Sequence, residues 1–427
     1  MPRTSTRAEP AYGELVSQYL ALREDHPGVL LLFRVGSFYE VLFDDAELVA
    51  RELGLKLGDR PSGGSAPPVP QCGFAQHALD SFLGRLLTKG YRVAVVEEEE
   101  EEDTEQNPGV RQRAVVRTLT PGTLVDPALL AEDRATYLLA IAADTDRFGL
   151  AWTDVAAGEF KAGEFDAESA AAEGQRLMPA ELLITAEAVV PETLLAYGTI
   201  TRVGATTGAR EVLRTAFPER TLADLPLAEI AAGLVVRYLA ETAPRGQLPA
   251  LDAPAPTAST DALQMDAVTQ RHLELVETER TRDRNGSLLA TLDRCATPMG
   301  RRILRSWLLR PLRDTGKIAV RQAIIGELVA NPSLLQALSQ VLAQTPDLER
   351  LAGRAAARIV SIDDLQALAG VPALLERAQA DVGSARTSFL RMLGRERAGI
   401  AVLATEAARV LANAGTGDPI RHGASPA

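Results

Sequence analysis

The chain has 427 residues, an apolar content of 46% and a formal net charge of −12. This length predicts two to three domains, and the composition is that of a globular protein with no apolar run long enough to cross a bilayer. The acidic balance argues against a protein that coats nucleic acid by charge alone, but it is compatible with reading nucleic acid shape through a local surface. The two cysteines, Cys72 and Cys295, are far apart in sequence and suggest neither a disulfide framework nor a zinc site.

The first part of the chain alternates short helices and strands, which predicts an α/β or α+β domain. Residues 1–10 are expected to be a disordered tail, and no signal peptide is visible there, so the cytoplasm is the expected compartment. The predicted helices are Tyr12–Arg23, Asp44–Leu53 and His77–Lys89, and the predicted strands are Val29–Phe33, Leu55–Leu57 and Arg92–Val96. Pro61–Pro70, which is rich in Gly, Ser and Pro, is expected to be a loop at a ligand surface.

Phe38 and Glu40 follow the strand Val29–Phe33 in a chain that has few aromatic residues. At positions i and i+2 of an extended segment, their side chains point to the same face. One use of such a pair is a wedge, in which the ring stacks in a base step and the carboxylate accepts a hydrogen bond from the displaced base. The alternative is a core phenylalanine beside a solvated glutamate.

The acidic run Glu97–Asp103 contains charges that repel one another and would also repel phosphate. We therefore expect a solvated loop or a fraying strand end here, away from any surface that binds DNA.

A second unit follows, with predicted strands at Tyr137–Asp144, Phe148–Val155, Gly158–Phe165 and Leu182–Thr185 and a predicted helix at Leu227–Ala240. Its acidic residues Asp144, Asp154 and Glu159 raise the alternative of a metal-dependent nuclease, because two-metal chemistry needs carboxylates that converge on one site. Acidic residues at strand ends are more often simple turn formers.

The proline-rich stretch Ala243–Thr257 has the composition of a linker, and the chain beyond it is predicted to be helical. Thr297 is expected to cap a helix whose first residue is Pro298. Ile303, Leu304, Trp307 and Leu308 then form an apolar stripe that is expected to lie in the core of a helical bundle.

Several spaced motifs resemble the MutS family of DNA mismatch recognition proteins. They are Gly36-Ser37-Phe38-Tyr39-Glu40, Phe43-Asp44-Asp45-Ala46, Pro70-Gln71-Cys72-Gly73-Phe74, His77-Ala78-Leu79, Gly90-Tyr91-Arg92-Val93-Ala94, Thr120-Pro121-Gly122-Thr123, Leu263-Gln264-Met265-Asp266, Thr297-Pro298-Met299-Gly300, Asp347-Leu348-Glu349-Arg350-Leu351 and Ile362-Asp363-Asp364-Leu365. Family members carry a Glu-Gln pair where this chain has Glu97 and Glu98, so the local geometry there is expected to differ.

The resemblance implies a multidomain chain. The expected parts are a disordered tail at 1–10, an α/β mismatch-recognition domain at 11–122, a ribonuclease-H-like α/β connector at 123–245, a linker at 246–259 and all-α core or lever helices at 260–427. It further implies that the chain ends within the core helices, before the clamp and ATPase domains of the family.

By the same resemblance, Phe38 is the ring that stacks on a mispaired or unpaired base, and Glu40 is its hydrogen-bonding partner. Arg34, Arg60 and Arg117 are expected as contacts to the DNA backbone. No catalytic or metal-binding residue is expected in the chain.

The resemblance implies double-stranded DNA with mismatches or small loops as the ligand, a MutL-type repair protein as a partner, a homodimer, and association with the nucleoid. The family uses ATP and Mg, but this chain has no Gly-x-x-x-x-Gly-Lys-Ser/Thr segment to wrap phosphates and is not expected to hydrolyse ATP unaided. The alternative is a scaffold that binds a repair partner through its connector without reading DNA.

Overall fold

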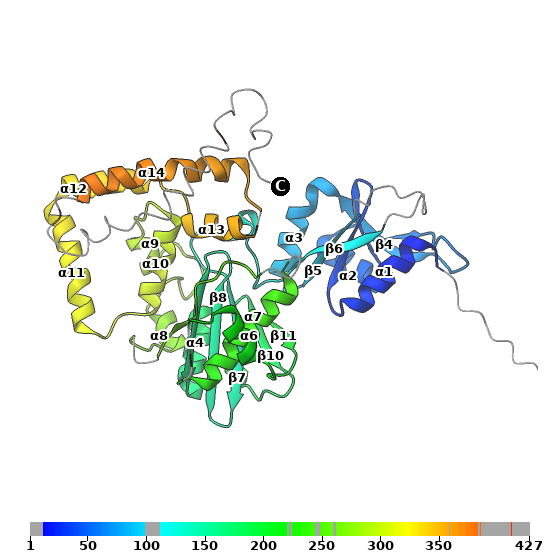
Figure 1. Cartoon of the computed structure of the whole chain (residues 1–427), viewed down its shortest axis with the longest axis horizontal. Helices are drawn as coiled ribbons and strands as arrows, with labels where there is room; N and C mark the ends of the chain where they lie inside the picture. Colours follow the sequence, from blue (N-terminus) through cyan, green and yellow to red (C-terminus); the bar gives the residue numbers. More distant parts are fainter. Residues whose placement is uncertain are drawn as a thin grey trace, which may run out of the picture.

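The computed structural model describes residues 12–98, 112–219, 222, 224–243, 248–258, 262–357, 359–382, 385 and 411. Two α/β bodies and a set of helices follow one another along the chain (Figure 1). The predicted tail and most of the acidic run lie outside the described residues. No helix in the described part of the chain is long and apolar enough to span a membrane.

The first body is built on a six-stranded sheet with the order β3-β4-β2-β1-β5-β6. Its strands are β1 (Leu30–Val35), β2 (Phe38–Leu42), β3 (Gly58–Arg60), β4 (Val69–Ala75), β5 (Val93–Glu98) and β6 (Arg113–Leu119). Only β1 and β5 pair in parallel, and the other neighbours are antiparallel. The prediction of a strand at Leu55–Leu57 is wrong, because pairing with β4 begins only at Gly58.

Helices cover both faces of this sheet. Helix α1 (Glu14–Asp25) packs on one face through Val16 and Tyr19, which join a core with Leu31 and Phe33. The other face is covered by α2 (Asp44–Leu53) and α3 (Leu79–Thr88), the latter following the 3₁₀ turn η1 (Gln76–Ala78). Because both faces of β1 are buried, an unbroken apolar run is what this strand requires, as the sequence predicted.

The second body is a six-stranded sheet with the order β11-β10-β7-β8-β9-β12. Its strands are β7 (Tyr137–Asp144), β8 (Arg147–Asp154), β9 (Glu159–Phe165), β10 (Glu181–Thr185), β11 (Thr199–Val203) and β12 (Ala255–Pro256). Strands β7, β8 and β9 form an antiparallel meander, whereas β10, β11 and β12 pair in parallel. The short strand β12 comes from the proline-rich stretch predicted as a linker, so part of that stretch completes the sheet.

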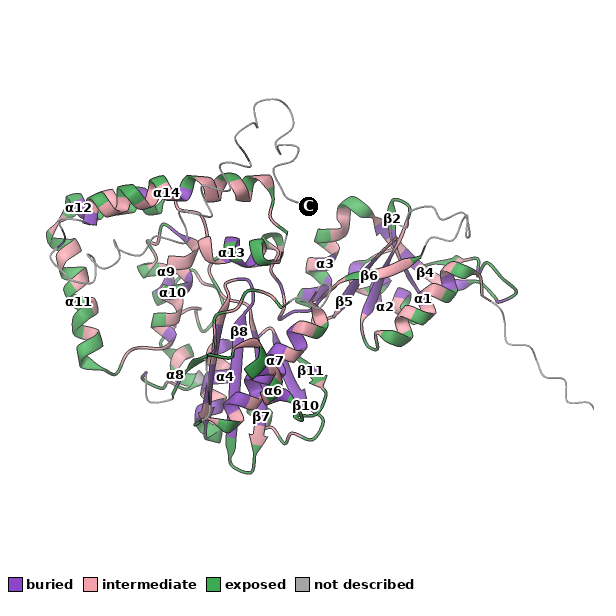
Figure 2. Cartoon of the chain, in the orientation of Figure 1, coloured by how far each residue is buried: buried purple, intermediate pink, exposed green. Residues whose placement is uncertain are grey.

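Two pairs of helices enclose the second sheet. Helices α4 (Ala167–Leu177) and α5 (Glu192–Leu195) lie over one face, and α6 (Ala209–Ala216) and α7 (Pro226–Thr242) over the other. The turn η2 (Pro127–Leu129) lies in the segment between the two bodies. Both bodies are therefore α/β, as predicted, and together they hold most of the buried residues (Figure 2).

The regular elements of the remaining described chain are helices, joined by turns and irregular segments. Its helices are α8 (Ala267–His272), α9 (Leu288–Leu292), α10 (Pro298–Leu309), α11 (Thr315–Ala330), α12 (Pro332–Leu342), α13 (Leu348–Ala356) and α14 (Ile362–Val382). The capping prediction is confirmed, because the Oγ1 atom of Thr297 accepts a hydrogen bond of 3.0 Å from the backbone N–H of Gly300. Side chains of Asp314, Asn331 and Asp347 cap the following helices in the same way.

The apolar stripe on α10 is not in a core, which corrects the sequence prediction. Ile303 and Trp307 are 48% and 43% exposed, and the guanidinium of Arg321 lies 3.6 Å from the centre of the Trp307 ring. The helix instead turns Arg302 and Leu309 inward. The reason is an ion pair: both terminal nitrogens of Arg302 lie 2.7 Å from the Asp347 carboxylate, which fixes the rotation of the helix.

Candidate nucleic-acid interface

Phe38 lies at the start of β2, immediately after the turn that joins β1 and β2. The turn contains Gly36 at a φ of +60°, a backbone conformation that favours glycine. The register pairs Val35 with Phe38, so the phenylalanine is the first residue of the hairpin ladder. Its side chain is 50% exposed, whereas the next residue, Tyr39, is buried. The geometry therefore presents the ring at the end of the sheet rather than in the core.

Glu40 shares the face of β2 that carries Phe38, as the spacing predicted. Its carboxylate accepts a hydrogen bond from the Nη1 atom of Arg60 on β3, and the two side chains are 14% and 22% exposed. Between them in the sheet lies Gly73 on β4, where a Cβ atom would come within 2.8 Å of the Tyr39 carbonyl oxygen. Glycine at this position leaves room for the Glu40 side chain to cross β4 toward Arg60.

The opposite face of the same hairpin is tied to β5 by a second charged group. The Nη1 atom of Arg34 lies 2.5 Å from the Glu97 carboxylate, and the Tyr39 hydroxyl donates a hydrogen bond to the same carboxylate. Burial, together with Glu97, raises the pKa of the Tyr39 hydroxyl well above its usual range. Glu97 is therefore in a strand and paired, so the first residues of the acidic run hold the hairpin instead of forming a free loop.

The three arginines expected at the DNA backbone do not lie together. Arg60 is on the face of Phe38 and Glu40 and pairs with Glu40. Arg34 pairs in register with Tyr39, and Arg117 with Val95, so both belong to the other face of the sheet. Of the three, only Arg60 lies on the face of the predicted wedge, whereas Arg34 belongs to the same hairpin and donates from Nε to the carbonyl oxygen of Gly36 at 3.3 Å.

Two contacts that the sequence did not reveal brace this region. The backbone N–H of Gln76 donates to the carbonyl oxygen of Ser37 at 2.9 Å, which fixes the β1–β2 turn against η1. The loop expected at Pro61–Pro70 is shorter, because Val69 and Pro70 pair in β4; it is anchored at the start of α1, where the N–H of Gly13 donates to the carbonyl oxygen of Ser62 at 2.8 Å. Both are backbone contacts, and side-chain patterns carry no signal for them.

The carboxylates of the nuclease alternative do not converge. Strand β7 pairs Tyr137 with Asp154 and, seven residues farther on, Asp144 with Arg147, so Asp144 and Asp154 lie at opposite ends of the meander. Glu159 faces Asp154 across β8 and β9 but is bound by Lys161 and the Tyr137 hydroxyl. No group of three metal-ligating side chains occurs among the described residues, so the geometry required for two-metal cleavage is not formed by these three.

A buried glutamate connects the first two bodies. Glu181 on β10 is fully buried, and its Oε1 atom accepts hydrogen bonds of 2.6 Å from Thr201 and Tyr238. Its Oε2 atom accepts from the Thr120 hydroxyl and from the N–H of Gly122 at 3.0 Å. The motif Thr120-Pro121-Gly122-Thr123 therefore has a structural role: it attaches the end of the first body to the second sheet.

Comparison with known proteins shows three family matches in chain order. Residues 14–128 match the family model MutS domain I, residues 136–252 match MutS domain II, and residues 268–412 match MutS domain III. Phe38, Glu40 and the whole first sheet therefore fall within the region that matches domain I.

Curated relatives agree with these matches. DNA mismatch repair protein MutS of Symbiobacterium thermophilum is 39% identical over 374 residues, which are 83% of this chain and 42% of the relative. The proteins of the same name from Thermosynechococcus vestitus and Trichormus variabilis are 37% and 36% identical over 89% of this chain, and 46% and 47% of their own lengths are covered. The chain thus spans less than half the length of these relatives. With two α/β bodies and a helical part in the order of MutS domains I, II and III, the chain belongs to the MutS family.

Proposed function

We propose that this chain binds mismatched double-stranded DNA in DNA mismatch repair, with Phe38 as a wedge inserted from the minor groove. The observation that carries the proposal is the half-exposed Phe38 ring, held at the end of a hairpin within the region that matches MutS domain I. A ring so placed is available to stack on a base without leaving a cavity in the domain.

The energetics favour discrimination through the deformability of DNA. Stacking a base on an aromatic ring contributes about 1–3 kcal/mol, whereas bending a site costs roughly 1–6 kcal/mol. The wedge alone does not offset a large bend. Since a mismatched or unpaired base is extruded at a lower cost than a paired one, the difference in this cost becomes the preference for a lesion.

Glu40 acts in this proposal as the acceptor for a hydrogen bond from the displaced base. An ionised carboxylate has two oxygens and about four acceptor positions, so the bond from Arg60 leaves acceptor capacity. Arg60 also keeps the carboxylate on the face of β2 that carries Phe38. We expect Glu40→Ala to reduce the preference for a lesion less than Phe38→Ala does, since one hydrogen bond contributes about 1 kcal/mol.

The test is fluorescence anisotropy of the purified chain against two labelled duplexes, one perfect and one with a single unpaired thymine, at two salt concentrations. The parent is expected to prefer the duplex with the lesion, and Phe38→Ala to bind both duplexes equally while keeping its unfolding temperature. Leu57→Ala is the matched control, because Leu57 is also apolar and exposed, at 44%, in the same domain. Equal preference in Phe38→Ala and the parent would contradict the proposal.

ATP-dependent signalling is expected to need more than this chain. The sequence contains no Gly-x-x-x-x-Gly-Lys-Ser/Thr segment, and the family models that match it are domains I, II and III. We therefore expect no release of phosphate from ATP above background, with or without mismatched DNA. Turnover that depends on magnesium and follows the protein through purification would overturn this part of the proposal.

A further inference from the structure

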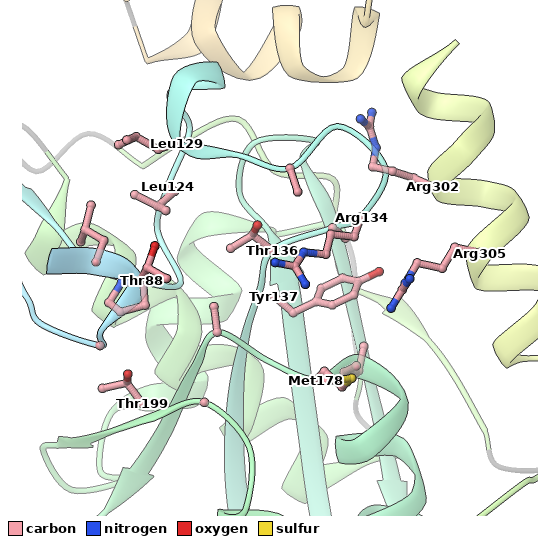
Figure 3. Close-up of a pocket in the computed structure, with 18 of the residues that line it drawn as sticks. Thr88, Leu124, Leu129, Arg134, Thr136, Tyr137, Met178, Thr199, Arg302 and Arg305 are labelled. Atoms are coloured by element: carbon pink, nitrogen blue, oxygen red, sulfur yellow. The ribbon is translucent and has the colours of Figure 1, made fainter. Parts of the chain in front are cut away.

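A cavity of about 460 Å³ lies where the three parts of the chain meet. Its walls come from the end of α3, from the segment at 121–137, from the end of α4 with the following turn, and from one side of α10 (Figure 3). Each part of the chain therefore contributes to this one space, which is separate from the Phe38 hairpin.

The charge of the lining is one-sided. The cavity is lined by the cations Lys89, Arg134, Arg176, Arg302 and Arg305, and no Asp or Glu occurs among the described residues that line it. The whole chain has a net charge of −12, so a lining that contains cations and no carboxylate differs from the average composition of the chain. A concave wall with one sign of charge attracts ligands of the opposite sign.

Three of these cations already have carboxylate partners outside the cavity. Lys89 lies 2.6 Å from Glu52, Arg176 binds Glu173 with two nitrogens, and Arg302 binds Asp347. Their charges are therefore largely balanced within the protein.

Arg134 and Arg305 differ from the other three. No carboxylate in the described part of the chain lies within ion-pair distance of either guanidinium, and each side chain reaches toward Tyr137 from its own side of the cavity (Figure 3). Burial lowers the pKa of Arg305, and the nearby charges of Arg134 and Arg284 lower it further against the opposing effect of Glu277 and Asp133. Two like charges thus face one space without a counter-charge in it.

The other end of the cavity is apolar and carries hydroxyl groups. Leu124 and Leu129 lie there with Thr88, on the side away from the two arginines (Figure 3). A ligand that fits both ends has an anionic group at one end and an apolar or aromatic group at the other.

We propose that this cavity binds a small organic phosphate, with the guanidinium groups of Arg134 and Arg305 holding the phosphate. The planar guanidinium matches phosphate oxygens with paired N–H donors, which makes arginine suited to this task. Because the walls belong to three parts of the chain, a bound anion stabilises the arrangement in which those parts are together.

The experiment uses isothermal titration and thermal unfolding of the full chain with phenyl phosphate and with inorganic phosphate, at constant ionic strength set by sodium chloride. Phenyl phosphate is expected to bind more tightly than inorganic phosphate and to raise the unfolding temperature. Arg305→Gln and Arg134→Gln are each expected to weaken binding about tenfold or more, the loss of a charged hydrogen-bonding group. Without ligand, Arg305→Gln is expected to retain the parent's unfolding temperature or exceed it, because repulsion is removed.

The matched control is Arg147→Gln, which removes the same charge from a side chain that is 59% exposed and lies at the end of the β7–β8 pair opposite Tyr137, outside the lining. It is expected to leave phenyl phosphate binding unchanged, as is Phe38→Ala. Equal losses in Arg147→Gln and Arg305→Gln would overturn the proposal, since they would mean attraction by overall charge. Absence of binding by both phosphates would overturn it too. If Arg305→Gln weakened only duplex DNA binding, the ligand would be the DNA backbone and the small-anion proposal would be wrong.

Discussion

At the level of single residues, the carboxyl group of Asp154, at the end of β8, makes the unfolding free energy depend on pH. The residue is 1% exposed, its Oδ1 atom accepts a hydrogen bond of 3.1 Å from the N–H of Ala156, and its Oδ2 atom has no partner among the described residues. Burial raises the pKa of this carboxyl to about 6, although Arg350 and Arg302 act in the opposite direction.

The sign of the effect follows from proton binding. Between pH 4 and pH 6 the folded chain holds a proton on Asp154 that the unfolded chain has released, so the contribution of this group to stability falls as the pH rises. Relative to Asp154→Asn, the parent is expected to lose on the order of 3 kcal/mol of unfolding free energy between pH 4 and pH 7. Urea unfolding of both proteins at several pH values measures this difference. Parallel pH profiles would show that the carboxyl is ionised in the folded chain throughout this range.

At the scale of the element, the hydroxyl of Thr297 determines how α10 begins. Thr297 is 6% exposed and its Oγ1 atom accepts from the Gly300 N–H, while Pro298 takes the first helical position. Thr297→Ala is expected to lower the unfolding free energy by about 1 kcal/mol, because the cap is lost. Thr297→Ser, which keeps the hydroxyl, is the control and is expected to retain most of that stability in the same urea titration. Equal losses in the two variants would assign the effect to the methyl group instead.

At the scale of the whole molecule, Gly353 sets how closely the helical part approaches the second sheet. A Cβ atom at Gly353 on α13 would come within 2.3 Å of the carbonyl oxygen of Ala156, in the turn between β8 and β9. Nearby, Arg350 donates to the carbonyl oxygens of Ala131 and Arg134 at 2.7 and 3.1 Å. At Gly353 the two backbones meet directly, so this part of the contact has little room to adjust.

Gly353→Ala is expected to push α13 away from the sheet, lower the thermal unfolding temperature and increase cleavage by a protease in the segment before α13. The matched control is Gly370→Ala in α14, where a Cβ atom meets nothing within 4 Å. This control is expected to stabilise the chain by about 0.5–1 kcal/mol, since alanine favours a helix over glycine. A stabilised Gly353→Ala variant would mean that α13 does not rest on this turn in solution.

Local patterns in the sequence were sufficient for some of the elements, whereas the strands β3, β4, β6 and β11 and the helices α4, α5 and α6 were not predicted. The apolar run at Val29–Phe33, the successive strands of the meander with their turns, and the cap at Thr297 were predicted because each depends on neighbours in the chain. The strand β4 was missed, since Pro70 and Gly73 interrupt its apolar pattern, and its partners β2 and β3 are separated from it in sequence. Residues 69–75 form a strand because they pair with β2 and β3, and such pairing cannot be read from neighbouring residues in the sequence.

For the site, the sequence was enough to predict that Phe38 and Glu40 share a face, because alternation along an extended strand has a period of two. Which charged side chains accompany them depends on the packing of distant parts of the chain. This packing pairs Glu40 with Arg60, turns Arg34 to the opposite face and places Asp144 and Asp154 at opposite ends of a sheet. Residues far apart in the chain meet through strand order and helix rotation, and these are set by packing across the whole molecule. For that reason the sequence did not predict that cations gather at the junction of the three parts.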